Sequence, residues 1–266
     1  MPKAKLGDIE LYYERAGEGP PLVFISGTGG DLRVKPNVFD GPLVKAFDVV
    51  GYDQRGLGRS AKPDVAYSMA DYGDDAAALM DHLGWAKAKV IGVSFGGMVA
   101  QELALRHPAK VERLVLACTS PGGAGGASFP FHEIQHLKGE ARARHLIPIS
   151  DTRRGDAWAA ANPKTYAEFV AMGSADPFAG EPGREMGARR QLEARAGHDT
   201  WARLGEIACP VMIAAGRYDG IALPETQQRM AGRIRDPQLQ FFEGGHLFMI
   251  QDRAALPAMV TFLDGG

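Results

Sequence analysis

Short apolar runs alternate with amphipathic stretches along most of the chain. The runs are rich in Val, Ile and Leu without polar alternation, a pattern typical of parallel strands covered on both faces. They predict strands at Pro21–Ser26, Phe47–Asp53, Lys89–Ser94, Val111–Cys118, Pro210–Gly216 and Leu239–Glu243. Helices are predicted at Met69–Leu83, Gly96–His107, Pro224–Ile234 and Arg253–Leu263. This alternation predicts an α/β sheet with right-handed crossovers.

Two segments do not follow this alternation of predicted parallel strands and helices. Ile9–Arg15 alternates polar and apolar residues and predicts an antiparallel edge strand. Residues 121–200 contain no buried strand, and we expect three or four short helices there, inserted into a core domain formed by residues 1–120 and 201–266. The insertion is either a solvated helical excursion or a cap over a site at the strand ends. The prolines expected to break its helices are Pro148, Pro163, Pro177 and Pro182.

Composition and charge narrow the class of protein. The chain has 266 residues, a formal net charge of −2 and 45% hydrophobic residues. These values exclude wholesale disorder and give no electrostatic footprint for binding nucleic acid or an anionic membrane. The longest uncharged run, Leu114–Phe131, contains prolines and a glycine cluster, so we interpret it as a strand and a loop.

The compartment follows from the first residues and from the cysteines. The N-terminal segment lacks the apolar core of a secretory signal. Two cysteines, Cys118 and Cys209, cannot form a disulfide framework. We therefore expect a reduced cytoplasmic protein, either a monomer or a homo-oligomer.

The strongest chemical signal is the sequence Gly-Val-Ser-Phe-Gly-Gly at 92–97, between a predicted strand and a predicted helix. In this context a G-x-S-x-G motif forms a strained turn that exposes the serine oxygen above the sheet. Ser94 is therefore the candidate nucleophile, the alternative being a glycine-rich turn with an incidental serine. A serine nucleophile needs a base and an orienting acid. Asp219 and His246 follow the last two predicted strands, in the order that this architecture requires.

A developing oxyanion needs two hydrogen-bond donors. One candidate is the amide of Phe95, directly after the nucleophile, and the other is the amide of Thr28 in the glycine-rich loop 26–30. That loop lacks the spacing of a dinucleotide or phosphate site, which leaves a plain turn as the alternative. His132 and His136 have the i, i+4 spacing of a metal clamp but no third ligand, so we expect neither a metal nor a cofactor.

The sequence Asp-Gln-Arg-Gly-Leu-Gly-Arg-Ser at 53–60 also follows a predicted strand. Its acidic and basic residues, Asp53 and Arg55, are interpreted as polar contacts of a structural turn, with glycines that shape the loop.

Taken together, these motifs resemble those of the α/β-hydrolase family: SGTGG at 26–30, YDQRGLGRS at 52–60, GVSFGG at 92–97, GRYD at 216–219 and GGH at 244–246. The resemblance covers nearly the whole chain. It implies an α/β-hydrolase fold, with a mostly parallel eight-stranded sheet, helices on both faces and an inserted helical cap, and it implies the triad Ser94–Asp219–His246. Many members have His-Gly before the oxyanion residue. This chain has Ser26-Gly27, and in this it is similar to the 3-oxoadipate enol-lactonase branch.

The serine at position 94 sets the expected activity. It argues against the branches with an aspartate nucleophile, the haloalkane dehalogenases and epoxide hydrolases. The resemblance implies a cofactor-independent hydrolase of a carboxylic ester or lactone, with an acyl-enzyme on Ser94. Carbon–carbon bond hydrolysis, amide cleavage and perhydrolysis by the same triad stay open, as does a ligand receptor with little turnover on the same scaffold.

The sequence does not assign the substrate-binding residues. Apolar side chains of the cap either line an acyl pocket or bury the cap against the core, and six arginines are candidates to receive a substrate carboxylate. The apolar set is Phe129, Phe131, Trp158, Tyr166, Phe169, Met172, Phe178 and Met186, and the arginines are Arg33, Arg142, Arg153, Arg154, Arg189 and Arg190.

Overall fold

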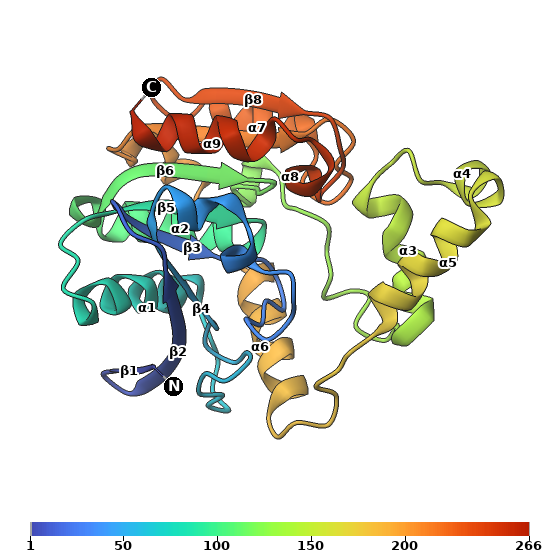
Figure 1. The fold of residues 1–266 in the computed structure, drawn as a ribbon, viewed down its shortest axis with the longest axis horizontal. Helices are drawn as coiled ribbons and strands as arrows, with labels where there is room; N and C mark the ends of the chain where they lie inside the picture. The colour runs from blue at the N-terminus through green and yellow to red at the C-terminus, as the bar shows by residue number, and fades with distance from the viewer. Residues whose placement is uncertain (1, 266) are drawn as a thin grey trace.

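A computed structural model describes residues 2–265, and its centre is one eight-stranded sheet of order β1-β2-β4-β3-β5-β6-β7-β8 (Figure 1). The first two strands pair antiparallel, and β2 also pairs antiparallel with β4, whereas the six strands from β4 to β8 run parallel. The strands are β1 (Lys3–Leu6), β2 (Ile9–Ala16), β3 (Pro21–Ile25), β4 (Asp48–Tyr52), β5 (Ala88–Val93), β6 (Val111–Ala117), β7 (Val211–Gly216) and β8 (Gln238–Phe242).

Helices cover both faces of the sheet. One face packs against α1 (Met69–His82), α2 (Phe95–Arg106) and α7 (Pro224–Ala231), and the other against α8 (Phe248–Gln251) and α9 (Ala255–Asp264). Neighbouring strand residues such as Leu22 and Val23 belong to opposite core clusters, because successive side chains of a strand point to opposite faces. Both clusters are apolar, which explains why these strands appear in the sequence as continuous apolar runs.

All six predicted core strands are confirmed, with boundaries that differ by one residue at most. The prediction for Ile9–Arg15 is right about the antiparallel pairing but wrong about the edge, because β1 lies outside it. β1 is short and alternates lysines with small or apolar residues, which is how proteins commonly protect an exposed sheet edge. Four residues with two lysines give too weak a pattern to predict a strand.

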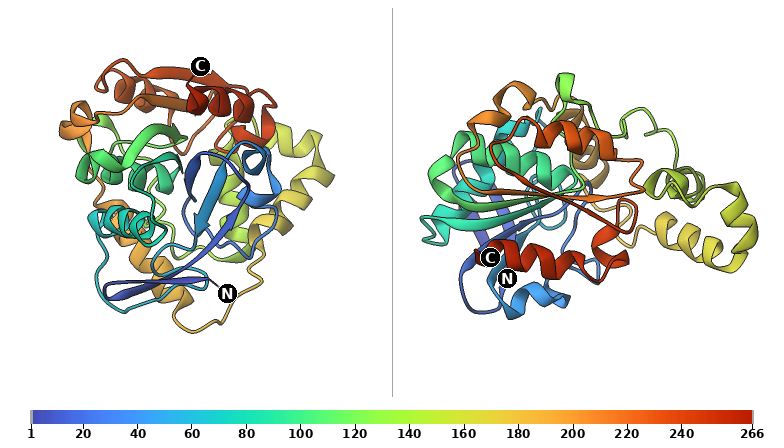
Figure 2. Two further views of the ribbon diagram at one scale, coloured as in Figure 1. Left: turned by 60° about the vertical axis from the view of Figure 1, so that its left-hand side comes forward. Right: turned by 90° about the horizontal axis from the view of Figure 1, so that it is seen from above.

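The helical insertion lies in the chain between β6 and β7. It contains α3 (Gly139–Ser150), α4 (Asp156–Ala161), α5 (Pro163–Ser174) and α6 (Arg184–Ala196). Figures 1 and 2 show α3, α4 and α5 as a lobe that extends away from the sheet, while α6 returns along the core. The prediction that Pro148 breaks a helix is wrong, since Pro148 lies within the last turn of α3. Pro163, in contrast, begins α5, where a missing amide hydrogen costs nothing.

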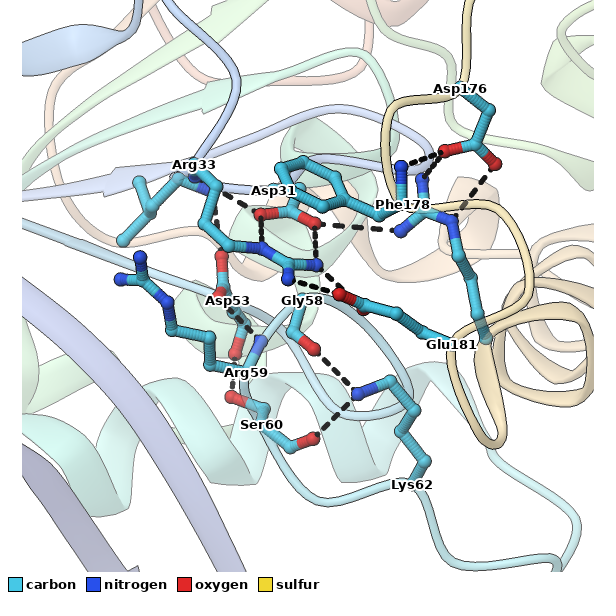
Figure 3. Close-up of polar contacts among 12 residues, drawn as sticks. Asp31, Arg33, Asp53, Gly58, Arg59, Ser60, Lys62, Asp176, Phe178 and Glu181 are labelled. Carbon is cyan, nitrogen blue, oxygen red and sulfur yellow. Dashed lines mark hydrogen bonds and ion pairs between the residues drawn. The ribbon is translucent and has the colours of Figure 1, made fainter.

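An ion-pair cluster joins the segment before α6 to the loop after β3 (Figure 3). The Arg33 guanidinium donates to Asp31 (Nη2–Oδ2 2.7 Å) and to Glu181 (Nη2–Oε2 2.9 Å), and it lies 3.6 Å from the centre of the Phe178 ring. The Asp31 side chain is 1% exposed, so solvent screens this contact less than an ordinary surface pair. The cluster therefore fixes one end of the insertion against the core.

A cavity of about 550 Å³ lies on the α9 face of the sheet, between the loop after β3 and α8. Pro36, Gly41 and Pro42 divide the connection from β3 to β4, which forms only the short 3₁₀ turns Val38–Asp40 and Pro42–Lys45 instead of a continuous helix. The walls are mostly apolar and include Phe24, Leu43, Met249 and Ile250. None of the three candidate catalytic residues lines this cavity.

The uncharged run Leu114–Phe131 is the strand β6 followed by a loop, as predicted. Among residues 2–265, no helix combines the length and the apolar character needed to cross a membrane.

Candidate active site

Ser94 lies in the tight turn between β5 and α2, with a backbone conformation of φ 56° and ψ −115°. A non-glycine residue rarely adopts a positive φ, and such strained residues cluster at functional sites. Gly92 and Gly96 make the turn possible, since a Cβ atom at either position would come within 2.4 Å of a backbone carbonyl oxygen. The turn places the hydroxyl of Ser94, a residue that is 7% exposed, at the carboxyl ends of the strands, next to the start of α2.

The structure brings the three predicted catalytic side chains into one hydrogen-bonded line. His246 Nε2 lies 2.9 Å from Ser94 Oγ, and His246 Nδ1 lies 2.8 Å from Asp219 Oδ2. Asp219 follows β7 and is fully buried, while His246 follows β8 with a side chain that is 12% exposed. The carboxyl ends of neighbouring parallel strands meet at one edge of the sheet, which explains why residues 152 positions apart come into contact.

The hydrogen-bond partners of Asp219 determine the proton positions on His246. Asp219 Oδ1 accepts bonds from the amides of Ile221 (2.8 Å) and Ala222 (2.9 Å), which hold the carboxylate in place. Because an ionised carboxylate can only accept, His246 Nδ1 must donate to Oδ2. His246 Nε2 is then unprotonated and oriented to accept the hydroxyl proton of Ser94, which is the arrangement a general base requires.

Both predicted oxyanion donors are free of protein partners. In the described residues, neither the Phe95 amide nor the Thr28 amide donates to a backbone or side-chain acceptor. The next amide of the loop, at Gly29, is taken by Gln191 Oε1 at 2.8 Å. Phe95 also begins α2, so the positive end of the helix dipole faces the same space.

The C-terminal turn of α3 holds the loops that carry the acid and the base. Its free carbonyl groups accept bonds from the Gly220 amide (Ile149 O, 3.0 Å) and from the His246 amide (Ser150 O, 2.6 Å). A Cβ atom at position 245 would come within 2.2 Å of the same Ser150 oxygen, so Gly245 permits this approach. The position of His246 therefore depends on the docking of the helical insertion, which the sequence did not indicate.

Asp53 and Arg55, in the structural turn predicted at residues 53–60, form polar contacts. Asp53 is fully buried and accepts bonds from the amides of Leu32 and Arg59 at 2.8 Å each. Burial raises the pKa of Asp53 to about 6, and the two amides partly oppose this shift. Arg55 forms a two-pronged ion pair with Asp75. These contacts fasten the 53–60 turn to the loop after β3 and to α1.

The helix face that the i, i+4 spacing of His132 and His136 suggests is absent, because residues 131–136 form turns rather than a helix. Within residues 2–265, no group of three or more His, Cys, Asp or Glu residues is arranged to hold a metal ion. Both His132 and His136 lie exposed in the loop before α3.

The candidate pocket residues separate into two groups. Phe129 lies beside the acid loop, where its amide donates to Ile221 O at 2.8 Å, and it packs against Phe131. Trp158 and Phe169 stack on each other in the outer lobe, and Met172 is 67% exposed.

The six candidate arginines differ in their charged partners. Five of them pair with carboxylates, whereas Arg142 has no carboxylate partner among residues 2–265 and lies over the Phe131 ring. The paired ones are Arg33 with Asp31 and Glu181, Arg153 and Arg154 with Asp151, and Arg189 and Arg190 with Glu193.

Sequence reasoning missed a buried polar cluster at the end of α6. Arg195 and His198 are 7% and 6% exposed, and Ser120, at the exit of β6, is fully buried. Neither ring nitrogen of His198, nor Arg195 Nε, nor Ser120 Oγ has a hydrogen-bond partner in the described part of the chain. Arginine and histidine near a helix end ordinarily face solvent, so no local signal distinguishes these residues from their exposed neighbours.

We expect His198 to make the protein acid-sensitive. Burial lowers the pKa of His198 to about 4, below the ordinary value of 6.5 that it regains on unfolding. The unfolded chain therefore binds the proton first, and stability that is complete above about pH 6.5 is lost as the pH falls toward 4. Between pH 7 and pH 5 the loss from this group is about 2 kcal/mol.

The test is urea unfolding of the wild-type protein and of His198→Gln at both pH values. The variant should lose about 2 kcal/mol less than the wild type over this interval. The raised pKa of Asp53 acts in the opposite direction but equally in both proteins, so it cancels in the difference. Equal losses in the two proteins would show that His198 titrates normally.

Comparisons with known proteins agree with this arrangement. A family model described as the alpha/beta hydrolase fold matches residues 20–252. The putative carbamate hydrolase RutD of Variovorax paradoxus (strain S110) is 31% identical over 258 residues, which cover 92% of each chain. The poly(3-hydroxyalkanoate) depolymerase of Ectopseudomonas oleovorans is 30% identical over 91% of this chain and 84% of that protein. The crystal structure of the enol-lactonase from Burkholderia xenovorans LB400 superposes with a TM-score of 0.80 over all of both chains, at 25% identity.

The sheet order, the serine turn and these matches lead to one assignment. The model match alone covers most of the chain, and the relatives align over nearly their full lengths. The chain belongs to the α/β-hydrolase fold family.

Proposed function

We propose that this protein is a serine hydrolase that cleaves a carboxylic ester or lactone of a small molecule through an acyl-enzyme on Ser94. The observation that carries the proposal is the continuous line from Ser94 Oγ to His246 (2.9 Å) and on to Asp219 (2.8 Å), beside two free amides. A serine with a base and an oxyanion site is the machinery of acyl transfer.

The proposed reaction has two halves. Ser94 Oγ attacks the substrate carbonyl carbon while His246 Nε2 takes the hydroxyl proton, and the Phe95 and Thr28 amides stabilise the oxyanion. The carbonyl re-forms, the bond to the leaving oxygen breaks, and His246 returns the proton to that oxygen. Water then repeats the sequence on the acyl-enzyme, which releases the acid and restores Ser94.

Asp219 supports each proton transfer without accepting a proton itself. Its carboxylate stabilises the imidazolium that forms at His246 and keeps Nδ1 as the protonated nitrogen. Every step uses this chain's own side chains, backbone amides and water, so the proposal includes no cofactor or metal.

The names of the relatives support hydrolysis at a carbonyl group but differ in the bond. The Burkholderia protein is an enol-lactonase and the Variovorax protein a putative carbamate hydrolase. The Ser26-Gly27 loop is similar to that of the enol-lactonase branch, which favours an ester or lactone as the bond that is cleaved. The two cysteines are free, which agrees with the cytoplasmic location included in this proposal.

The experiment is a substrate panel combined with active-site labelling. We expect turnover of short ethyl and 4-nitrophenyl esters or of five- and six-membered lactones, and labelling of Ser94 by a fluorophosphonate probe, located by peptide mass spectrometry. Turnover confined to carbamates, or labelling at another serine, would contradict the proposal. Binding without turnover of any ester, lactone or carbamate would favour a receptor.

A further inference from the structure

The buried polar atoms that lack a partner are concentrated at two neighbouring places. Ten such side-chain atoms occur in the described residues, and in a folded protein each one calls for an explanation such as a ligand or ordered water. Three of them, on Thr28, Gln54 and Gln191, surround the loop that carries the Thr28 amide. Four others belong to Ser120, Arg195 and His198.

The second group lines a cavity of about 60 Å³, which has room for a small polar group or for ordered water. Its walls combine the end of α6, the exit of β6 and the first part of the insertion. The lining residues are Met98, Ser120, Gly122, Ala127, Ser128, Pro130, His132, Arg195, Ala196 and His198.

Arg195 gives this cavity a positive charge without a counter-ion. It is the one buried arginine in residues 2–265, and no carboxylate pairs with it. Its guanidinium donates to Phe129 O (2.7 Å) and Ser128 Oγ (2.7 Å) and lies 4.5 Å from the centre of the Phe131 ring. Nε remains free, and Arg142, another arginine without a carboxylate partner in the described residues, lies 5.7 Å from the same ring centre. A buried charge without a partner is costly, and a bound anion would remove that cost.

Three contacts connect this cavity to the reaction centre. Gln191 and Arg195 are one turn apart on the same face of α6, and Gln191 binds the Gly29 amide next to Thr28. Ser120 follows Thr119, whose hydroxyl donates to the Ser94 carbonyl at 2.7 Å.

The third contact is made by Phe129, which joins the cavity to the loop that carries Asp219. Its carbonyl accepts from Arg195, and its amide donates to the carbonyl of Ile221, which lies two residues after Asp219. The cavity is thus attached to the loops of the nucleophile, the oxyanion donors and the acid.

We propose that the Arg195 cavity is a subsite that binds a carboxylate group of the substrate, with Arg195 as the cation and the hydroxyls of Ser120 and Ser128 as further donors. The inference rests on the proposed function and narrows its substrate class to acidic esters or lactones. Arginine and hydroxyl donors match a planar carboxylate, and the neutral His198 adds one donor without a competing negative charge.

The test uses matched substrates that differ only in the distal group. Ethyl monoesters of four- to six-carbon dicarboxylic acids are compared with ethyl esters of monocarboxylic acids of the same length, by titrating the acid released. The wild-type protein should prefer the best acidic ester over its neutral counterpart by roughly tenfold or more in kcat/KM. Arg195→Gln should lower kcat/KM for the acidic ester by roughly 30-fold and for the neutral ester by less than about threefold.

Three further variants separate the subsite from a purely structural role. Arg189→Gln removes an exposed arginine of the same helix and should leave kcat/KM unchanged for both substrates. Ser120→Ala removes a hydroxyl without a protein partner. It should lower kcat/KM by a few-fold for the acidic ester only. Arg195→Lys retains the charge and should keep part of the preference. If Arg195→Gln does not fold, the selective effects of Ser120→Ala and Arg195→Lys decide the question.

Several results would overturn the subsite. One is a wild-type preference for the neutral esters, and another is an equal loss on both substrates in the Arg195 and Ser120 variants. If the wild type hydrolyses no ester, the proposed function fails, and the subsite is then tested alone by calorimetry with the free dicarboxylates. Binding to the wild type that is lost in Arg195→Gln would support the subsite, while absence of binding, which would leave ordered water in the cavity, would refute it.

Discussion

Ser94→Ala should lower kcat for ester hydrolysis by roughly 10⁴-fold or more. The substitution removes the oxygen that would carry the proposed acyl group but leaves the Phe95 and Thr28 amides in place to polarise a bound carbonyl. A residual rate above that of water is therefore expected, from direct attack by water in the oxyanion site. The measurement is steady-state hydrolysis of 4-nitrophenyl butanoate, together with loss of fluorophosphonate labelling.

The matched control is Ser174→Ala, which removes a hydroxyl that bonds only to a carbonyl of its own helix, Ala171 O. It should leave kcat within about twofold of the wild type. Alanine at position 94 retains the backbone contacts of the turn, so thermal unfolding should change little. If Ser94→Ala keeps kcat within tenfold of the wild type while folding normally, the acyl-enzyme mechanism is wrong.

The core of the fold was predictable because its strands are buried on both faces and therefore have continuous apolar sequences. The turns at their carboxyl ends are short, so a residue just past a strand has few positions available. This is why the G-x-S-x-G motif and the positions just past β7 and β8 were enough to predict that Ser94, Asp219 and His246 lie close together. β1 was missed because two of its four residues are lysines. The break predicted at Pro148 was wrong because a proline in the last turn of a helix removes few hydrogen bonds.

The polar cluster of the cap was not predictable, for a different physical reason. Arg189, Arg190 and Arg195 lie within two turns of α6, yet the first two pair with Glu193 while Arg195 is buried without a carboxylate. Their difference comes from how α6 packs on the segment 128–131, which is distant in sequence. The same holds for the α3 carbonyl groups that bind the His246 and Gly220 amides.

Asp219→Asn should lower kcat by roughly 10³- to 10⁴-fold although the side chains have the same shape. The reason lies in the fixed orientation of the carboxylate. Oδ1 accepts from the amides of Ile221 and Ala222, so the asparagine oxygen must occupy that position and its NH₂ group must face His246. His246 Nδ1 then has to accept, the ring proton moves to Nε2, and Nε2 can no longer accept the proton of Ser94.

The position of the ring proton on His246 distinguishes a reversed tautomer from a simple loss of the Asp219 charge. ¹⁵N NMR of the histidine ring at neutral pH should show the proton on Nδ1 of His246 in the wild type and on Nε2 in Asp219→Asn. Asp199→Asn, which removes the same charge at an exposed position, should change neither the tautomer nor kcat. An Asp219→Asn protein that retains the Nδ1 proton but loses activity would mean that the carboxylate acts through its charge alone. Full activity with the reversed tautomer would exclude His246 as the base that serves Ser94.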